Sequence, residues 1–291
     1  MIPYKKILIP TDGSNDTRAA ITFALGMGKI TGAEVTAMCV NDVTNYAIPW
    51  DASAPDTDSP HYKACENAVR TVADRGAQMG VDVRTLVVTG IPIREIIDAS
   101  KNYDLIVMGT AGRAGVSLML LGSVAQKVIR FASCPVLVIR GDQPGGLACH
   151  RILIPTDGTS ITRTAITHGL EMARAFNAEV TALSVSSGRS IPLPLRRNAE
   201  QITPDAARKA VDSVADMGRG LGIVVKPVVV TGSVANEIIR ASAGQDLLVM
   251  GTAGRTGFEY LRLGSVAEKT VRHARCPVLV VRAPETMLPK I

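Results

Sequence analysis

Short apolar runs alternate along the chain with longer segments in which apolar residues recur every three or four positions. The short runs predict buried strands at residues 5–10, 34–40, 81–89, 105–108 and 136–139. The same series returns at 151–155, 179–185, 224–231, 247–250 and 278–281, again with helical segments between the strands. Strands that alternate with helices predict an α/β fold with a parallel, doubly wound sheet and helices on both of its faces, and each half supplies five strands.

The second half of the chain repeats the first. The segment KILIPTDGS at 6–14 returns as RILIPTDGT at 151–159, and residues 104–140 return at 246–282 with about two-thirds of their positions identical. A chain of 291 residues has room for about two domains. The Gly/Pro-rich stretch GDQPGGLACH at 141–150 is typical of a joint between domains. We therefore expect tandem domains at 1–141 and 150–291, with residues 142–149 as the linker.

A glycine-rich loop follows the fourth predicted strand of each half. Glycine lets backbone N–H groups lie close to a ligand, and the helix predicted after the loop adds free N–H groups at its start. Ser123 is a candidate N-cap for that helix. The loop therefore predicts a phosphate-binding site; the alternative is that the glycines only form tight turns. The two copies have the same spacing: Gly109, Gly112, Gly122 and Ser123 in the first, and Gly251, Gly254, Gly264 and Ser265 in the second.

The turn after the first strand of each half has the sequence Pro-Thr-Asp-Gly. It places Asp12, and Asp157 in the repeat, at the carboxyl edge of a sheet, where open α/β sheets bind their ligands. The same aspartate would also suit an Asx turn or a helix cap. The identical context in both halves favours a ligand role.

Composition narrows the function classes. Aromatic residues make up only 3% of the chain, which disfavours recognition of single-stranded nucleic acid by base stacking. The net charge is +6, and all of the excess lies in the second half: residues 1–149 have 14 basic and 14 acidic side chains, and residues 150–291 have 18 and 12. That excess would attract an acidic partner or form a solvated basic surface. A dehydrogenase is disfavoured because no GxGxxG follows the first strand, and the motifs GxxxxGK[ST], HExxH and GxSxG do not occur.

The five cysteines have no metal-ligand spacing. Cys134 and Cys276 occupy the same position in the two halves, before a proline and a buried strand, so we interpret them as core thiols. His168 replaces Phe23 at a helix position that should face the core, and we expect a structural or partly exposed histidine there. A signal peptide and an apolar run of 18 residues are both missing from the sequence, which predicts a cytoplasmic protein without membrane segments.

The repeated G-x2-G-x9-G-[ST] pattern resembles the ATP-binding loop of the universal stress protein family, and both halves resemble that family in its tandem form. The resemblance implies a Rossmann-like fold of the adenine nucleotide alpha hydrolase type, with ATP as ligand, either alone or with Mg2+. It places the first-strand aspartate near the ribose, the end of the second strand at the base, and the glycine loop with its serine at the phosphates. The implied contacts are Pro10, Thr11, Asp12, Val40, Met108, Gly109, Gly112, Arg113, Gly122, Ser123 and Val124 in the first half. In the second half they are Pro155, Thr156, Asp157, Val185, Met250, Gly251, Gly254, Arg255, Gly264, Ser265 and Val266.

The leading hypothesis is an ATP-binding stress or regulatory protein without a dedicated catalytic base. The alternatives are a slow Mg-dependent ATPase and a binding module for another adenine nucleotide, such as AMP or a cyclic dinucleotide. Arg113 and Arg255 would contact terminal phosphates or lie on the surface, and Ala111 and Ala253 stand where many family members have histidine. The basic, proline-rich loop 186–203 would bind a partner or be solvated. The resemblance also implies that the last strands, 136–139 and 278–281, pair antiparallel within the chain, with a homodimer as a further option.

Overall fold

The computed structural model describes residues 4–45, 57–110, 121–140, 149–186, 202–252 and 263–282. The chain divides into two compact units, Tyr4–Leu147 and Ala148–Ile291, which are called the first and the second domain below. Each is an α/β domain built on a parallel sheet, as the alternation of apolar runs predicts.

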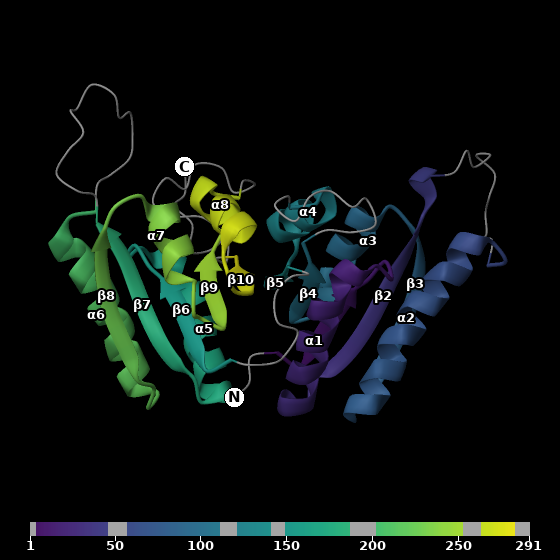
Figure 1. The fold of residues 1–291 in the computed structure, drawn as a ribbon, viewed down its shortest axis with the longest axis horizontal. Helices are drawn as coiled ribbons and strands as arrows, with labels where there is room; N and C mark the ends of the chain where they lie inside the picture. The colour runs from purple at the N-terminus through teal and green to yellow at the C-terminus, as the bar shows by residue number, and fades with distance from the viewer. Residues whose placement is uncertain are drawn as a thin grey trace, which may run out of the picture. The chain divides into compact units, whose positions relative to one another are not determined.

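The described residues of the first domain form five parallel strands in the spatial order β3-β2-β1-β4-β5 (Figure 1). Its strands are β1 (Lys6–Pro10), β2 (Glu34–Asp42), β3 (Val83–Gly90), β4 (Leu105–Gly109) and β5 (Val136–Ile139). Its helices are α1 (Arg18–Thr31), α2 (Pro60–Met79), α3 (Pro92–Ala99) and α4 (Ser123–Phe131), with short 3-10 turns at Asn15–Thr17, Val43–Asn45 and Ser100–Asn102.

The second domain has the same order of elements, β8-β7-β6-β9-β10. Its strands are β6 (Arg151–Pro155), β7 (Glu179–Ser186), β8 (Val225–Thr231), β9 (Leu247–Gly251) and β10 (Val278–Val281). Its helices are α5 (Ser160–Phe176), α6 (Pro204–Gly220), α7 (Val234–Ala241) and α8 (Ser265–His273).

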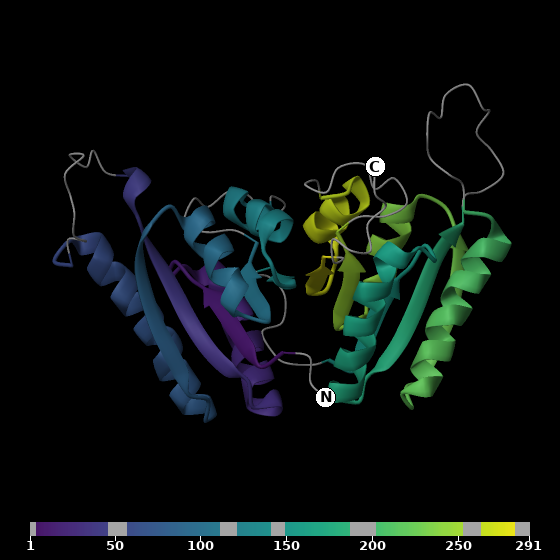
Figure 2. The same cartoon turned by 180° about the vertical axis from the view of Figure 1, so that it is seen from behind.

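Right-handed crossovers distribute the helices over the two faces of each sheet. In the first domain the chain moves from β1 out to β3, so α1 and α2 pack together on one face (Figure 1). It then returns across β1 to β4 and β5, which puts α3 and α4 together on the opposite face (Figure 2). The direction of winding therefore reverses between β1 and β4, and in the second domain it reverses between β6 and β9. The doubly wound fold expected from the sequence is confirmed.

The core of each domain lies on the central strands, whose side chains are covered from both faces. Ile7, Leu8 and Ile9 of β1 are fully buried, and so are Ile152, Leu153 and Ile154 of β6. The edge strand β3, which has a neighbour on one side only within its domain, is more exposed. This burial explains why the central strands read as continuous apolar runs in the sequence.

An aspartate fastens the amino end of the first strand in each domain. Asp104 Oδ2 accepts hydrogen bonds from the N–H groups of Lys5 and Lys6, both at 2.9 Å. Asp246 Oδ2 accepts the same two bonds, from His150 and Arg151, again at 2.9 Å. Because these aspartates come directly before β4 and β9, they hold the two strands that flank the winding reversal in a fixed register.

The predicted element boundaries agree with the structure to within two residues at most strand ends. Strand β2 extends two residues beyond the predicted end, to Asp42, and β3 begins at Val83 instead of residue 81. Cys134 and Cys276 are buried, which confirms their interpretation as core residues. Antiparallel pairing of the last strands remains a prediction. None of the helices in the described ranges has both the length and the hydropathy that crossing a bilayer requires.

Candidate functional site

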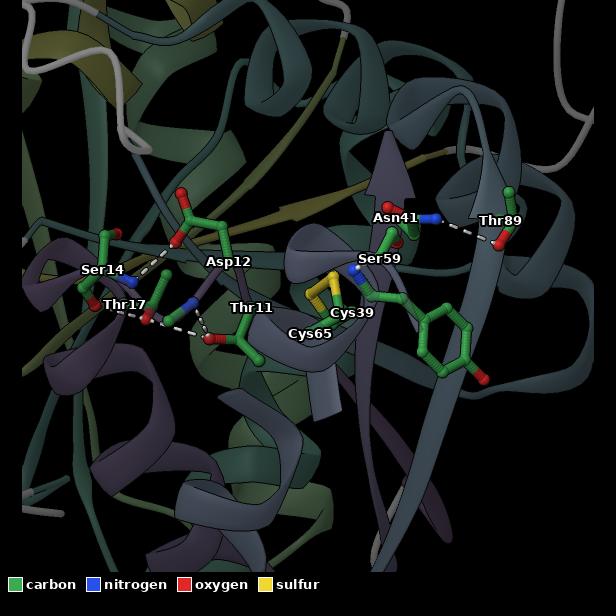
Figure 3. The surroundings of a disulfide bond; sticks show 11 residues. Thr11, Asp12, Ser14, Thr17, Cys39, Asn41, Ser59, Cys65 and Thr89 are labelled. Carbon is green, nitrogen blue, oxygen red and sulfur yellow. Dashed lines mark hydrogen bonds between the residues drawn. A yellow bond between two sulfur atoms is a disulfide. The ribbon is translucent and has the colours of Figure 1, made fainter. Parts of the chain in front are cut away.

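The turn after β1 is held together by its own side chains. Thr11 is buried, and its N–H donates to the carbonyl oxygen of Met38 in β2 at 2.8 Å. Its Oγ1 accepts from the Gly13 N–H at 3.1 Å and lies 3.2 Å from Thr17 Oγ1. Asp12 Oδ1 accepts from the Ser14 N–H at 2.9 Å, which is an Asx turn. The half-buried Asp12 carboxylate is thereby fixed at the carboxyl edge of the sheet, as Figure 3 shows.

Glycine is needed at the third position of this turn. Gly13 has φ +78° and Gly158, its counterpart, has φ +79°, a conformation that other residues adopt only with strain. The identical Thr-Asp-Gly sequence in the two halves thus encodes the same backbone conformation twice. The structure supports the Asx-turn interpretation of the aspartate, and this role leaves the second carboxylate oxygen, Oδ2, outside the turn bond.

The second turn repeats the first with two added contacts, one of which is a hydrogen bond from Thr162 Oγ1 to Asp157 Oδ1 at 3.3 Å. The Thr156 N–H donates to Leu183 O at 2.8 Å, and Asp157 Oδ1 accepts from the Thr159 N–H at 3.0 Å. Thr159 Oγ1, which replaces Ser14 Oγ, also donates to Asp157 Oδ1 at 2.6 Å. Ser14 Oγ is buried without a hydrogen-bond partner among the described residues. The two aspartates therefore occupy the same place with different hydroxyl neighbours.

The end of β2 presents main-chain groups beside the Asp12 turn. Pairing between β1 and β2 ends at Pro10 and Met38, while β2 continues to Asp42 beside β3. Main-chain groups of a strand point to alternate neighbours, so the N–H and C=O of Val40 point the same way as those of Met38. They therefore point past the end of β1. Val185 has the same relation to Leu183 and the end of β6.

The glycine loop leaves the sheet at the end of β4 and closes on a main-chain hydrogen bond. Met108 and Gly109 are buried at the end of the strand, and the Gly122 N–H donates to Thr110 O at 2.7 Å. In the second domain the Gly264 N–H donates to Thr252 O at 2.8 Å. Each loop thus returns its last glycine to the carboxyl edge, next to the start of α4 or α8.

The prediction that Ser123 caps α4 is wrong. Gly122 has the extended conformation of an N-cap, with φ −61° and ψ 153°, and its carbonyl accepts the first helical bond, from Gln126 N at 2.9 Å. Ser123 is therefore the first residue of the helix, and its side chain is exposed. Gly264 and Ser265 have the same arrangement. The N–H groups of residues 123–125 lie in the first turn, where an α-helix has no acceptors of its own.

These features meet at the winding reversal. β1 and β4 are paired neighbours, so the Asp12 turn and the Gly109 loop leave adjacent strands at the same edge of the sheet. Open α/β sheets bind ligands in the crevice formed at this point. Pro10, Val40 and Val124 belong to the same edge, and the second domain places Pro155, Thr156, Val185, Met250, Gly251 and Val266 equivalently. Gly112, Arg113, Gly254 and Arg255 lie outside the described residues, as do Ala111, Ala253 and most of loop 186–203.

Sequence reasoning missed Asn41, the residue after Val40. It is 5% exposed, and its Nδ2 donates to Thr89 Oγ1 at 3.4 Å, while its Oδ1 has no partner within the described part of the chain. In the second domain Ser186 stands there and its Oγ lies 2.8 Å from Thr231 Oγ1. The sequence did contain a signal for this residue: Asn41 has an amide side chain and directly follows Val40, the candidate contact at the end of the predicted strand.

Sequence reasoning also missed a disulfide. Cys39 of β2 and Cys65 of α2 are bonded, with their Cα atoms 5.3 Å apart and a separation of 26 positions in the sequence (Figure 3). Both are buried. The spacing carries no signal of its own, because the pair forms only when α2 packs over β2.

Burial sets the ionisation of the groups around the two cores. It raises the pKa of Cys134 and of Cys149 to about 12, because the thiolate loses its hydration. Burial also lowers the pKa of His168, since the charged imidazolium is disfavoured in the same way. His168 is half-buried on α5, in agreement with the expectation of a structural or partly exposed histidine.

Comparison with known proteins decides the family. The model of the universal stress protein family matches the chain twice, at residues 3–140 and 149–282. The chain belongs to the universal stress protein family. A universal stress protein of Methanocaldococcus jannaschii is 39% identical over 140 residues, which are 47% of this chain and 82% of that protein. One from Mycolicibacterium smegmatis is 27% identical over 290 residues, 95% of this chain and 96% of its own length.

A solved structure agrees over the whole length of the chain. A universal stress protein from Archaeoglobus fulgidus superimposes with a TM-score of 0.74 at 22% identity, and the match covers 97% of each chain. At that identity the likeness concerns the fold. The match includes residues of both domains of this chain.

Proposed function

We propose that this member of the family binds ATP at two sites, one at the carboxyl edge of each sheet, and acts as a nucleotide-dependent regulator. The observation that carries the proposal is the convergence of three different groups at one edge. These are a fixed carboxylate at Asp12, a main-chain donor and acceptor at Val40, and the start of α4 at Ser123. Each matches one part of a nucleotide.

The phosphates would lie at the start of α4. The free N–H groups of the first helical turn and the helix dipole favour an anion there. The exposed Ser123 hydroxyl adds a further donor. Placing the glycine at the cap and the serine inside the helix strengthens this assignment, because the serine side chain is not used in a cap hydrogen bond.

The ribose and base would lie towards β1 and β2. A carboxylate accepts hydrogen bonds from the ribose hydroxyls, and the Asx turn of Asp12 fixes its position before the ligand arrives. An adenine edge presents an amino donor beside a ring-nitrogen acceptor, and the C=O and N–H of Val40 match that pair. We propose ATP in preference to another adenine nucleotide because the start of α4 offers a phosphate subsite in addition to the subsites for the base and the ribose.

The protein side of the site offers binding groups and no evident base. Among the described residues that we assign to the nucleotide, Asp12 is the ionisable group, and we place it at the ribose instead of at the terminal phosphate. Mg2+ would then enter with the nucleotide, held mainly by the phosphates, where it neutralises their charge. We therefore propose binding without efficient turnover.

Ser123→Asp in the full chain tests the phosphate assignment. A carboxylate in the first turn suits the helix dipole, so α4 remains folded, whereas it repels a phosphate at the same place. Ser123→Asn is the matched neutral control. We expect Ser123→Asp to weaken ATP binding at the first site by at least ~10-fold in calorimetry, and Ser265→Asp to do the same at the second site.

Competition and turnover complete the test. ATP should bind more tightly than AMP and adenosine, because only ATP fills the whole phosphate subsite, and phosphate release in the same samples should stay at background. Equal affinity for ATP in Ser123→Asp and Ser123→Asn would contradict the phosphate assignment. Tighter binding of AMP or of a cyclic dinucleotide would replace ATP as the ligand, and steady turnover abolished by Ser123→Asp would make the protein an ATPase.

A further inference from the structure

The disulfide of the first domain joins the end of a central strand to the helix that covers it. Cys39 lies near the carboxyl end of β2, and Cys65 lies in the second turn of α2. Their Cα separation of 5.3 Å is within the ordinary range for disulfides, so the two elements come together without displacement of the backbone. Cys39 is 2% exposed and Cys65 is 5% exposed, so the bridge lies inside the layer between α2 and the sheet.

The bridge is directly next to the proposed nucleotide site. Cys39 stands between Met38, whose carbonyl accepts the Thr11 N–H at 2.8 Å, and Val40, whose main chain we assign to the base. Figure 3 shows the disulfide between the Asp12 turn and the Asn41 end of β2. Beyond Met38 the strand has lost β1 as a neighbour, so the bridge fastens the part of β2 that is paired on one side only.

The fold does not need this bridge. In the second domain Ser184 corresponds to Cys39, because it follows Leu183 as Cys39 follows Met38. Ala207 corresponds to Cys65, because each lies three positions before an Ala-Val pair of its helix. Both are fully buried at the positions of Cys39 and Cys65, and the domain has the same order of elements. A domain of this size builds its own core, in contrast to the small domains that depend on disulfides. The pair is therefore available for regulation.

We propose that the Cys39–Cys65 pair is a reversible redox switch for the nucleotide site of the first domain, an inference that rests on the proposed function. In the disulfide state the end of β2 is fastened to α2, and the main chain of Val40 is organised for the base before the ligand binds. In the dithiol state this restraint is absent. The end of β2 must then be ordered when the nucleotide binds, and the free-energy cost of this ordering weakens binding. The second domain, with serine and alanine at these positions, binds independently of redox state.

The chemistry is thiol–disulfide exchange with a small disulfide such as oxidised glutathione. One cysteine thiolate attacks the small disulfide and releases one thiol, and the second cysteine then attacks the mixed disulfide and releases the other. The two protein thiols lose two electrons and two protons, and one small disulfide becomes two thiols. Burial also raises the pKa of Cys134 and Cys149 to about 12 and keeps them as thiols near neutral pH, so neither reacts without local opening of the fold.

The test measures oxidation and binding in the same samples. The full chain is equilibrated for hours in buffers of different glutathione to glutathione disulfide ratio, since exchange at a buried pair requires local opening. Thiols are then counted after denaturation, with three expected in the oxidised protein and all five in the reduced protein. Calorimetric titration with Mg-ATP uses Ser265→Asp to report the first site alone and Ser123→Asp to report the second.

We expect the affinity of the first site to fall about 5-fold or more on reduction, the lower end of coupling between linked sites, and to follow the thiol count. The second site should not change. The double variant Cys39→Ser, Cys65→Ala reproduces the buried pair of the second domain, so it should fold, bind like the reduced protein and ignore the redox buffer. This variant also excludes a direct effect of glutathione on nucleotide binding.

Three results would overturn the inference, and they are distinguishable. A thiol count that stays at three throughout the folded state would make the bridge a fixed structural bond. Unchanged ATP affinity at the first site despite complete reduction would remove the link to binding while leaving the proposed function intact. Absence of ATP binding at both sites in both redox states would overturn the proposed function and the switch together.

Discussion

The two domains have the same sheet, the same aspartate turn and the same helix start, but they differ in the surroundings of the second strand. The first domain bonds Cys39 to Cys65 and has Asn41 as the next-to-last residue of β2, whereas the second has Ser184, Ala207 and Ser186 at these positions. The shared parts are those that contact a nucleotide in our proposal. The differing parts are the neighbours of Val40 along β2 and the residue of α2 that packs against them. The duplication thus retained the groups that we assign to the nucleotide and varied the residues beside them.

The largest expected difference between the domains is in stability. The double variant Cys39→Ser, Cys65→Ala removes a bridge that closes a loop of 26 positions, and such a bridge stabilises the native state by about 3 kcal/mol through the unfolded chain. We expect the thermal transition of the first domain to fall by roughly 10 °C. Calorimetry of the oxidised wild type beside the variant checks this, and an unchanged transition would contradict it.

The second largest expected difference is in ATP binding, when the aspartate of one site is replaced and the other site is left unchanged. Asp12→Ala should weaken ATP binding at the first site about 10- to 100-fold, the loss expected for a hydrogen bond to a charged group, and Asp157→Ala should do so at the second. Asp12→Asn is the matched control, because asparagine also forms an Asx turn. Calorimetry with each variant resolves the two sites. If Asp12→Asn and Asp12→Ala bound as the wild type does, the aspartate would serve the turn alone.

A pH-dependent difference follows from the position shared by Phe23 and His168. Burial lowers the pKa of His168 below its ordinary value of 6.5, so the unfolded chain takes up a proton before the folded domain does. This contribution to stability is present above pH 6.5 and is lost as the pH falls through the folded-state pKa. His168→Phe should therefore reduce the loss of stability between neutral pH and pH 5, measured by urea unfolding at each pH. An identical pH profile in the variant would contradict the assignment.

The smallest predicted effect concerns Ser184. Its buried Oγ has no hydrogen-bond partner among the described residues, so Ser184→Ala removes a polar atom whose burial is not compensated. We expect the second domain to become more stable by up to about 1 kcal/mol in urea unfolding. A clear loss of stability would show that the hydroxyl does have a structural role.

The fold could be predicted because it depends on periodic features. Buried central strands such as β1 and β4 must be apolar along their length, and the repeat supplied each signal twice. The Thr-Asp-Gly turn was also readable, since Gly13 adopts a conformation that requires glycine. Two features could not be predicted, one local and one long-range. The cap of α4 is local, because the choice between Gly122 and Ser123 depends on the backbone conformation of a single residue. The Cys39–Cys65 bond depends on the packing of α2 over β2.

The most direct test of the central claim is a calorimetric titration of nucleotide-free, oxidised full-length protein with Mg-ATP, with phosphate release followed in the same cell. The account predicts two bound ATP molecules per chain, and no release above background. One bound ATP would show that the domains have diverged in binding itself. Absence of binding would contradict the account, because the aspartate turns, the main chain of Val40 and Val185 and the helix starts would then be structural features only.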